Sequence, residues 1–460
     1  MHANINDAFY NSLKRLMMPS TQSYQIRGSL VKEIPDFRFG IQDPRKNILM
    51  VPYRNNNIFA TCAEVLWVLA GRDDLAFLQH FLPRAHEFSD DKKVWRGAYG
   101  PRISDVFTRK QMPYQCNYTY SEIDDHQIKE YNPANLLSKN RLPGMMFNQI
   151  RNVVKILEKD RYSRQAIITI GQTEDYDNSL NTLDRPCTMF IQFLIRKDEN
   201  QSEEALHCYV YMRSNDCIWG CFNINVVEWT IVQILIAEAL GVNLGTYNHS
   251  ATSFHIYGRH FERAKKMLDN KMFIYDIEIL ESNLMVEHPP TKFNNDISAP
   301  LRIDLVMNGI AAFCDALMTT TGLGIRDFFG EAKEREIKIF TYIPQLANRF
   351  RTVPKIYDFA AITLFYVVMK YGDSKSKKNA MSWLLSGELL YDIYLAMAAI
   401  ENTNRLFIKE IRKNDPHNEI VKMFDNLLYS IYQKKIEPEQ EGANLMKQIT
   451  TYLNHSEETI

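Results

Sequence analysis

Apolar residues in the first part of the chain recur at two spacings, which predict helices mixed with strands. Helical spacing predicts three helices there, over residues 59–82, 145–159 and 224–240. Apolar runs of strand length predict strands over residues 29–31, 166–170, 189–195 and 207–212. Gly241 ends the third helix, as glycine commonly does. The mixture predicts an α+β fold, with a mixed sheet flanked by helices.

From about residue 300 onward the strand pattern stops, and apolar residues keep helical spacing. Helices are predicted over residues 303–318, 338–350, 357–370, 380–402 and 420–434. We therefore expect two domains: residues 1–298 would carry the sheet, and residues 299–460 would form an all-helical domain. The apolar stripes of the later helices are most simply core, so they indicate no chemistry of their own.

Composition and charge describe a soluble globular protein. The 460 residues are 45% hydrophobic and 24% charged, and the formal net charge is −1. This balance gives no sign of nucleic-acid or membrane binding, so we expect neither partner. The longest apolar run, residues 359–369, is too short to span a bilayer, and the N-terminus does not resemble a signal peptide. Any anionic ligand must therefore be held by local arginines.

The cysteine pattern indicates reduced thiols. The seven cysteines are an odd number without close paired spacing, which argues against a disulfide framework. A cytosol-like compartment is favoured, so the expected location is cytoplasmic. The chain has no Cys-x-x-Cys pair and no His-Glu-x-x-His helix, so no metal site is expected.

One thiol, Cys187, has neighbours that suit catalysis. It follows Pro186 directly, at the start of an apolar run of strand length. A thiolate is the best nucleophile among side chains, and a nearby guanidinium such as that of Arg213 favours the thiolate if the fold brings the two together. Arg213 can also grip a phosphate bidentately, and Ser214 can add a hydrogen bond. The alternative is that Cys187 is an ordinary buried thiol at a strand start.

Three further polar residues suit a nucleoside. The side-chain amide of Asn223 offers one donor and one acceptor, which matches the O4 and N3–H edge of uracil. An asparagine before a helix can instead be a cap. His255 and Tyr257 point the same way if their segment is extended, so they can hold a sugar hydroxyl, or they can simply face solvent.

Together these residues resemble the thymidylate synthase family, including its pyrimidine-nucleotide hydroxymethylase branch. The resemblance covers roughly residues 20–285 and rests on motifs that occur in one order: Ala63-Glu64-Val65-Leu66-Trp67 with Gly71, Tyr99-Gly100, Tyr162-Ser163-Arg164-Gln165, Pro186-Cys187, Gln192-Phe193, Arg213-Ser214-Asn215-Asp216, Gly220, Phe222-Asn223 and His255-Ile256-Tyr257. It implies a thymidylate-synthase-like catalytic domain over residues 1–298, to which residues 299–460 are an addition.

The resemblance implies an enzyme that transfers a one-carbon unit to C5 of a uracil nucleotide. Cys187 would add to C6 of the pyrimidine and make C5 a carbon nucleophile. Glu64 would organise water and proton transfer at O4, Tyr99 would stand near the C5 proton, and Asn223 would read the base. The one-carbon donor would be 5,10-methylenetetrahydrofolate.

The resemblance also implies the binding residues and a second subunit. A pyrimidine nucleoside monophosphate would be held by Arg27, Arg164, Arg213, Ser214, Asn223, His255 and Tyr257. The reduced folate would be bound by Asp216, Gly220 and Phe222. Arg164 would reach the phosphate from a second subunit, so an isologous homodimer is expected.

Several positions depart from the family pattern. Thr188 stands where thymidylate synthases commonly have histidine, and Gln165 follows Arg164 where a pair of arginines is usual. Residues 83–91 lack the tryptophans that usually wall the folate, and Phe88 is the only aromatic candidate. A looser folate wall favours entry of water, which would convert the captured methylene into a hydroxymethyl group.

Three functions are therefore open. The main expectation is a thymidylate synthase that converts dUMP to dTMP through a covalent Cys187 adduct. The first alternative is hydroxymethylation of dUMP or UMP, or of a cytidylate, by water capture; Asn223 favours uracil over cytosine. The second alternative is a non-catalytic nucleotide-binding dimerisation module.

Overall fold

The computed structural model describes residues 1–26, 28–51, 53–104, 148–177, 181–182, 184–197, 203–269, 297–319, 353–372, 374–385 and 393–434. Two sequence predictions, the helix over residues 338–350 and the phosphate contact of Arg27, lie outside the described residues. The described part combines a mixed sheet with flanking helices, which confirms the α+β class.

The sheet has seven strands within the described residues. In pairing order they are β1 (Ser23–Ile26), β2 (Ser29–Ile41), β7 (Asn243–Tyr257), β5 (Glu204–Met212), β4 (Thr188–Lys197) and β3 (Ile167–Thr169), with β6 (Asn215–Asp216) beside β7. β7 runs parallel to β5 and β6, and the other neighbours are antiparallel. A parallel pair needs a crossover connection, and helix α8 (Val226–Leu240) lies in the connection from β5 to β7.

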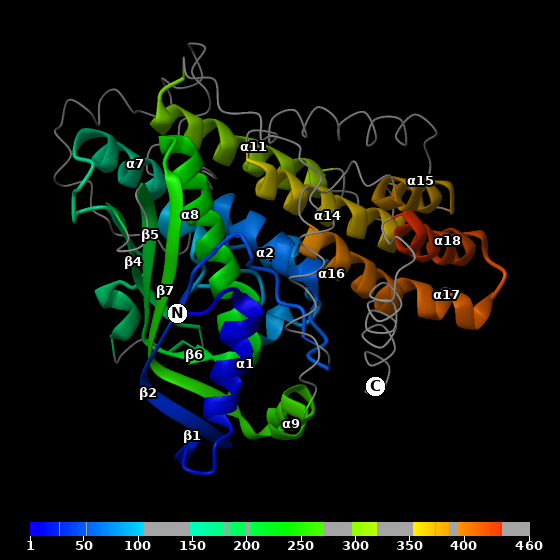
Figure 1. Ribbon diagram of the computed structural model, residues 1–460, viewed down its shortest axis with the longest axis horizontal. Coiled ribbons are helices and arrows are strands. Elements are labelled where there is room, and N and C mark those ends of the chain that lie inside the picture. The colour runs from blue at the N-terminus through cyan, green and yellow to red at the C-terminus, as the bar shows by residue number, and fades with distance from the viewer. Residues whose placement is uncertain are drawn as a thin grey trace.

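Helices cover one face of the sheet and extend away from it (Figure 1). The helices besides α8 are α1 (Ile5–Leu16), α2 (Ile58–Leu69), α3 (Leu75–Leu78), α4 (Gly100–Ile103), α7 (Gln149–Lys159), α9 (Phe261–Asp269), α11 (Ala299–Thr319), α14 (Pro354–Tyr371), α15 (Ser374–Leu385), α16 (Ile393–Thr403), α17 (Lys409–Asn414) and α18 (Glu419–Lys434). Short 3-10 segments are η1 (Ala85–Phe88), η3 (Thr173–Tyr176) and η5 (Gly258–His260), and π-helical segments are η4 (Cys217–Asn225) and η6 (Asn404–Ile408).

The helix formed by η4 and α8 is the centre of the core. Residues 217–240 are long and apolar enough to cross a membrane by length and composition, but 89% of the most apolar window is buried inside the fold. α8 packs on β5 and β7 on one side and on α2, α7 and α11 on others. Gly241 ends the helix with φ +64, the left-handed conformation that glycine adopts without strain.

The observed elements differ from the predicted ones at two kinds of position: a glycine that ends a helix, and a strand made largely of polar residues. The helix predicted over residues 59–82 ends at Leu69, because Gly71 turns the chain with φ +70 and Asp74 caps the separate helix α3. The long strands β2 and β7 were largely missed. β7 carries glycine, asparagine, histidine and serine, residues that do not signal a strand, yet β2 and β5 pair with it on both sides.

The later helices pack against α2 and the segment that follows it. α14, α11 and α16 all contact α2. At the ends of α2, the backbone N–H of Ile58 donates to Asn402 Oδ1 at 3.3 Å, and Arg72 pairs with Asp315 at 2.6 Å. Lys370 Nζ donates to the carbonyl of His80 at 2.6 Å. Helices far apart in sequence therefore hold both ends of α2.

We expect Gly100→Ala to destabilise the fold by about 1–3 kcal/mol, because its new Cβ would overpack a rigid backbone contact. A Cβ at Gly100 would lie 2.6 Å from the carbonyl oxygen of Arg72 and 2.7 Å from its nitrogen. Denaturant unfolding measures the change. Gly220→Ala is the control, since its nearest new neighbour is a side-chain oxygen at 3.4 Å. Equal stability of both variants would contradict the packing described here.

Candidate functional site

Cys187 and Arg213 meet at one end of the central strands. Cys187 directly precedes β4 and Arg213 directly follows β5, and the two strands pair there with Thr188 opposite Met212. The backbone N–H of Arg213 donates to the carbonyl of Cys187 at 2.9 Å. The pairing register shifts between Thr188 and Phe190, a bulge of the kind that re-aims side chains beside functional sites.

The Arg213 guanidinium lies against the Cys187 sulfur. Its Nη2 is 3.6 Å from Sγ and also donates to the carbonyl of Arg185 at 2.9 Å, while Nε donates to the carbonyl of Pro186 at 2.9 Å. Neither residue is fully buried, so both remain open to a ligand. A cation held this close stabilises negative charge on the sulfur. The sequence hypothesis required this proximity, and the structure has it.

A buried polar cluster fixes the segment before Cys187. Asp175, only 1% exposed, pairs with Arg102 at 2.5 Å and with Arg96 at 2.9 Å. The backbone N–H of Gly97, beside Arg96, donates to Asp184 at 2.8 Å. These residues were not singled out in the sequence, because buried ion pairs between distant segments leave no local pattern. These contacts restrain the chain segment that leads to Cys187.

The predicted nucleotide residues of β7 lie beside the same strand ends. β6 pairs with β7 so that Asp216 lies opposite His255. The rings of His255 and Tyr257 are in edge contact, with centroids 5.2 Å apart. Ser253, two residues before His255, donates its backbone N–H to the carbonyl of Arg213 at 3.3 Å. Cys187, Arg213, Ser214, Asp216, His255 and Tyr257 are therefore gathered at one end of the sheet.

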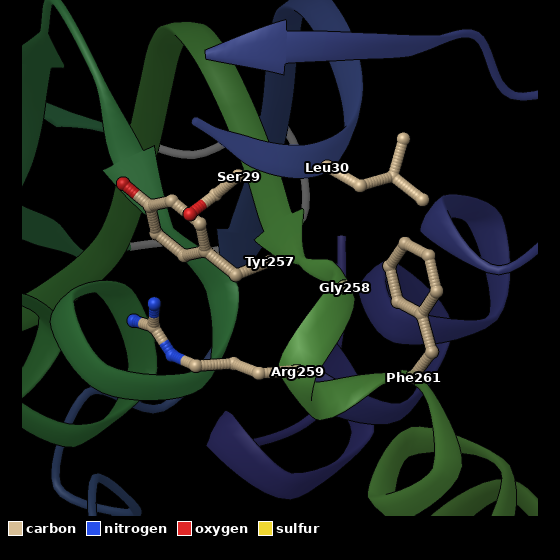
Figure 2. Close-up of a pocket in the computed structure, with 6 residues that line it drawn as sticks. All are labelled: Ser29, Leu30, Tyr257, Gly258, Arg259 and Phe261. Atoms are coloured by element: carbon tan, nitrogen blue, oxygen red, sulfur yellow. The ribbon is translucent and has the colours of Figure 1, made fainter. Parts of the chain in front are cut away.

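A pocket of about 310 Å³ opens beside Tyr257. Figure 2 shows the polar ends of Ser29, Tyr257 and Arg259 toward one side of it and the side chains of Leu30 and Phe261 toward the other. The Arg259 guanidinium carbon lies 4.4 Å from the Tyr257 ring centroid. Ser29 follows the turn that joins β1 to β2, where Gly28 adopts φ +75. One side of this pocket therefore carries hydroxyl groups and a cation, and it adjoins the end of the sheet where Cys187 lies.

Residues of α2, η4 and the start of α4 lie beside these strand ends. Asn223 on η4 is 7% exposed, and its Oδ1 lies 3.3 Å from the hydroxyl of Thr61, one turn before Glu64 on α2. Tyr99 accepts a hydrogen bond from the backbone N–H of Thr188 at 3.3 Å. Of the sequence-predicted helix residues, Tyr99 thus borders the segment that carries Cys187, while Asn223 lies against α2 one turn from Glu64.

Burial changes the acidity of two carboxyl groups in this region. Loss of solvent around the Glu64 carboxyl raises its pKa to about 7. Burial raises the pKa of Glu228 on α8 well above its usual range, and the neighbouring Glu64 charge raises it further. A carboxyl that titrates near neutral pH suits general acid–base work. Glu228 was not recognised from sequence, although it is a charged residue in the first turn of a largely apolar helix.

A second part of the candidate site lies at the end of β6 and the start of η4. It contains Asp216, Trp219 and Gly220. Asp216 caps η4 by accepting from the backbone N–H of Ile218 at 2.8 Å, and burial raises its pKa. Trp219 is 46% exposed, and its indole N–H donates to His260 at 3.2 Å. An acceptor carboxyl beside an exposed flat ring fits a planar ligand that carries N–H donors. Trp219 also shows that Phe88 is not the only exposed aromatic residue available to such a ligand.

Two predicted residues lie elsewhere. Arg164 is exposed before β3, at the sheet edge, and its carbonyl accepts from Gln192 at 2.8 Å. Phe222 is fully buried, where it stacks on Phe39 at 4.9 Å between ring centroids. It can support the segment between Asp216 and Asn223 but does not present its ring to solvent. Within one chain, the structure therefore does not bring Arg164 to Cys187.

Comparison with known proteins agrees with this geometry. The sequence model of the family described as thymidylate synthase matches residues 22–286. A protein of Bacillus phage SP01 named deoxyuridylate hydroxymethyltransferase is 26% identical over 365 residues, covering 78% of this chain and 82% of that protein. This coverage exceeds what residues 1–286 alone can supply, so the similarity extends into the helical part of the chain.

Two further relatives carry the same name. The protein from Delftia phage PhiW-14 is 31% identical over 230 residues, covering 48% of this chain and 51% of that protein. The protein from Pseudomonas phage M6 is 25% identical over 226 residues, covering 49% of this chain and 52% of that protein. These two matches span about half the length of the relatives concerned.

We expect Glu64→Gln to stabilise the fold at pH 8 and to have little effect at pH 4. The folded-state pKa near 7 exceeds the ordinary carboxyl value of 4.5, so the folded protein holds an extra proton between these values and loses stability as pH rises through them. The gain at pH 8 should be about 3 kcal/mol, since each pKa unit corresponds to about 1.4 kcal/mol.

Denaturant unfolding at both pH values measures this difference. Glu262→Gln is the control, because Glu262 is paired with Lys265 on the surface and its pKa is lowered. The control should show no gain as pH rises. A Glu64→Gln effect that is equal at pH 4 and pH 8 would contradict burial as the cause.

Proposed function

Because the chain belongs to the thymidylate synthase family of one-carbon transferases, we propose that it hydroxymethylates deoxyuridylate at C5. The observation that carries the proposal is the contact at 3.6 Å between the Arg213 guanidinium and the Cys187 sulfur, in a fold whose relatives are named deoxyuridylate hydroxymethyltransferases. The sequence-based expectation put thymidylate synthesis first; the relatives favour the alternative.

The nucleotide residues support a covalent mechanism that begins at Cys187. Arg213 and Ser214 hold the phosphate, and His255 with Tyr257 holds the sugar hydroxyl, so C6 of the uracil ring approaches the sulfur. The Cys187 thiolate adds to C6, and the electron pair of the C5–C6 bond becomes available at C5. Asn223 holds the O4 and N3–H edge, and Glu64 moves a proton to and from O4 through water.

The second substrate is 5,10-methylenetetrahydrofolate, which supplies the one-carbon unit. The acceptor carboxyl of Asp216 and the exposed ring of Trp219 fit a planar pterin, and Gly220, which follows Trp219 and has no side chain, leaves room for it. Tyr99 stands near the proton that leaves C5 once the new carbon–carbon bond has formed. Because its hydroxyl is un-ionised, Tyr99 positions a water molecule that takes this proton. Water then completes the hydroxymethyl group, so the folate is not oxidised.

Thymidylate synthesis is the second candidate, because the two reactions share every step before the methylene carbon is captured. Thr188 follows the nucleophile, where its side chain is fully buried and its hydroxyl has no partner among the described residues. A buried hydroxyl without a protein partner is normally satisfied by water. This feature favours a hydrated site and therefore the hydroxymethyl product.

The enzyme acts as a cytoplasmic homodimer in this proposal, with catalytic residues 1–298 and helical residues 299–460 as its two domains. Arg164 is exposed at the sheet edge and away from its own Cys187, which suits a residue that reaches the phosphate of a partner subunit. The helical domain braces α2, the helix that carries Glu64, through the contacts of Arg72 and Ile58.

Mass spectrometry of the products tests the reaction. With dUMP and 5,10-methylenetetrahydrofolate, the expected product is hydroxymethyl-dUMP without a rise in dihydrofolate absorbance. UMP, CMP and dCMP are the comparison substrates, and the cytidylates should react poorly because of Asn223. Cys187→Ala should lose turnover while it still binds dUMP. Formation of dTMP with equimolar dihydrofolate would instead establish the second candidate.

Mixing two inactive variants tests the placement of Arg164. Cys187→Ala lacks the nucleophile, and Arg164→Ala lacks the cation offered to its partner, so each homodimer should be nearly inactive. After random reassociation, half of the dimers pair one subunit of each kind and hold one complete site. Activity should then recover to about a quarter of the wild-type value. No recovery, despite proven subunit exchange, would contradict a role across the interface.

A further inference from the structure

Glu228 is a buried carboxyl that the mechanism above does not use. It lies in the first turn of α8, and its residue is 3% exposed. A carboxyl in such a place costs stability unless it is neutral or hydrogen-bonded. The side-chain amide of Asn225 donates a hydrogen bond to this carboxyl at 3.3 Å. Because burial of the Glu228 carboxyl costs stability, we ask what it contributes to the neighbouring site.

Contacts connect Glu228 to the catalytic residues on two sides. Asn225 accepts from the Asn215 side chain at 3.1 Å, and Asn215 lies in the segment that begins with Arg213. On the other side, Trp229 stacks on the ring of Tyr99 with centroids 5.5 Å apart. Glu228 is therefore held between the phosphate-binding segment and the residue that contacts the backbone beside Cys187.

Glu64 approaches Glu228 from the facing helix. α2 packs on both η4 and α8, and the contact between Thr61 and Asn223 fixes their relative position. Glu64 lies one turn after Thr61 on α2, and its charge acts on Glu228. Two carboxyls that feel each other's charge across packed helices resist ionising together, because like charges repel.

The other groups around Glu228 do not neutralise it. Tyr99, at the start of α4, and Tyr247, on β7, both feel its charge, and burial raises the pKa of each. Beyond Tyr247 lie the buried thiols Cys208 on β5 and Cys221 on η4. Within the described residues, no cation is among the groups that set the ionisation of Glu228. Its proton is therefore retained into the range where Glu64 ionises.

We propose that Glu228 is a positioning residue that shares one proton with Glu64 and keeps that proton in the site across neutral and mildly alkaline pH. Without Glu228, Glu64 alone would lose its proton near pH 7. With it, the pair as a whole gives up its last proton only at higher pH, because coupled groups titrate as a pair. This role rests on the proposed function, in which Glu64 serves O4.

The shared proton balances the covalent step. Addition of the Cys187 thiolate to C6 forms the sulfur–carbon bond and shifts the C5–C6 π electrons through C4 onto O4. A proton from the carboxyl pair neutralises O4. It returns to the pair when the C4–O4 double bond re-forms, as C5 takes its new carbon substituent. No oxidant or reductant enters, and the pair ends as it began.

The pH profile of kcat for product formation tests the proposal. Wild-type activity should stay level above pH 7, whereas Glu228→Gln should fall by about tenfold for each pH unit above it, since only Glu64 is left to hold the proton. Glu228→Asp, which keeps a carboxyl, should restore the level profile. Glu238→Gln removes another carboxyl of α8 that lies toward Arg45, and its profile should match the wild type.

Two results would overturn the proposal. The first is a Glu228→Gln profile that is merely scaled down at every pH, which is the effect of a purely structural residue. The second is a Glu228→Asp profile that follows Glu228→Gln although a carboxyl is present.

An infrared titration decides the question without activity and without a Glu228 variant that must fold. A carboxylic-acid band that persists above pH 7 in the wild type should titrate at lower pH in Glu64→Gln, because the charge that raises the pKa of Glu228 is gone. Bands from other buried acids cancel in the difference between the two proteins. Identical titrations would reject the pair.

The two readouts separate the proposals. If no product forms, the function fails while the infrared result still stands. If product forms with unchanged pH profiles, the pair fails alone.

Discussion

The proposed active site depends on one contact, between the guanidinium of Arg213 and the thiol of Cys187. The two groups meet where the antiparallel strands β4 and β5 pair. The start of β4 and the end of β5 pair side by side, so the residues adjacent to each strand, Cys187 and Arg213, are brought together. The same guanidinium also binds two carbonyls of the segment before the thiol. A single side chain thus fixes the nucleophile, stabilises its charged form and remains available to a phosphate.

Around that contact the fold buries Glu228 and removes part of the solvent around Glu64, while the thiol stays partly exposed. α8 and α2 cover the sheet, and the C-terminal helices brace α2 at both ends. Desolvation then moves the acidity of Glu64 to the neutral range, where proton transfer to and from a pyrimidine oxygen is most effective. The appended helices therefore bear on the chemistry, because they hold the helix from which Glu64 projects.

Sequence patterns predicted the fold class and proposed the site residues, and the failures of the element predictions have physical causes. Cys187, Arg213 and Asn223 were identifiable because short motifs carry them. The strand β7 was missed because its polar residues are tolerated only between two paired neighbours. Glu228 was overlooked because its relation to Glu64 depends on the packing of α8 against α2. An amino-acid sequence does not show which helices pack together. The proposed reach of Arg164 into a partner subunit likewise depends on two chains, which a single sequence does not describe.

Intact-protein mass spectrometry with a nucleotide analogue tests the central claim most directly. A dUMP analogue with fluorine at C5 cannot lose that substituent as a cation, so the adduct should stall after the one-carbon unit is attached. We predict a protein mass increased by nucleotide plus folate, with peptide mapping that places the adduct on Cys187. An unmodified protein under conditions in which dUMP is turned over, or an adduct on another residue, would contradict the account.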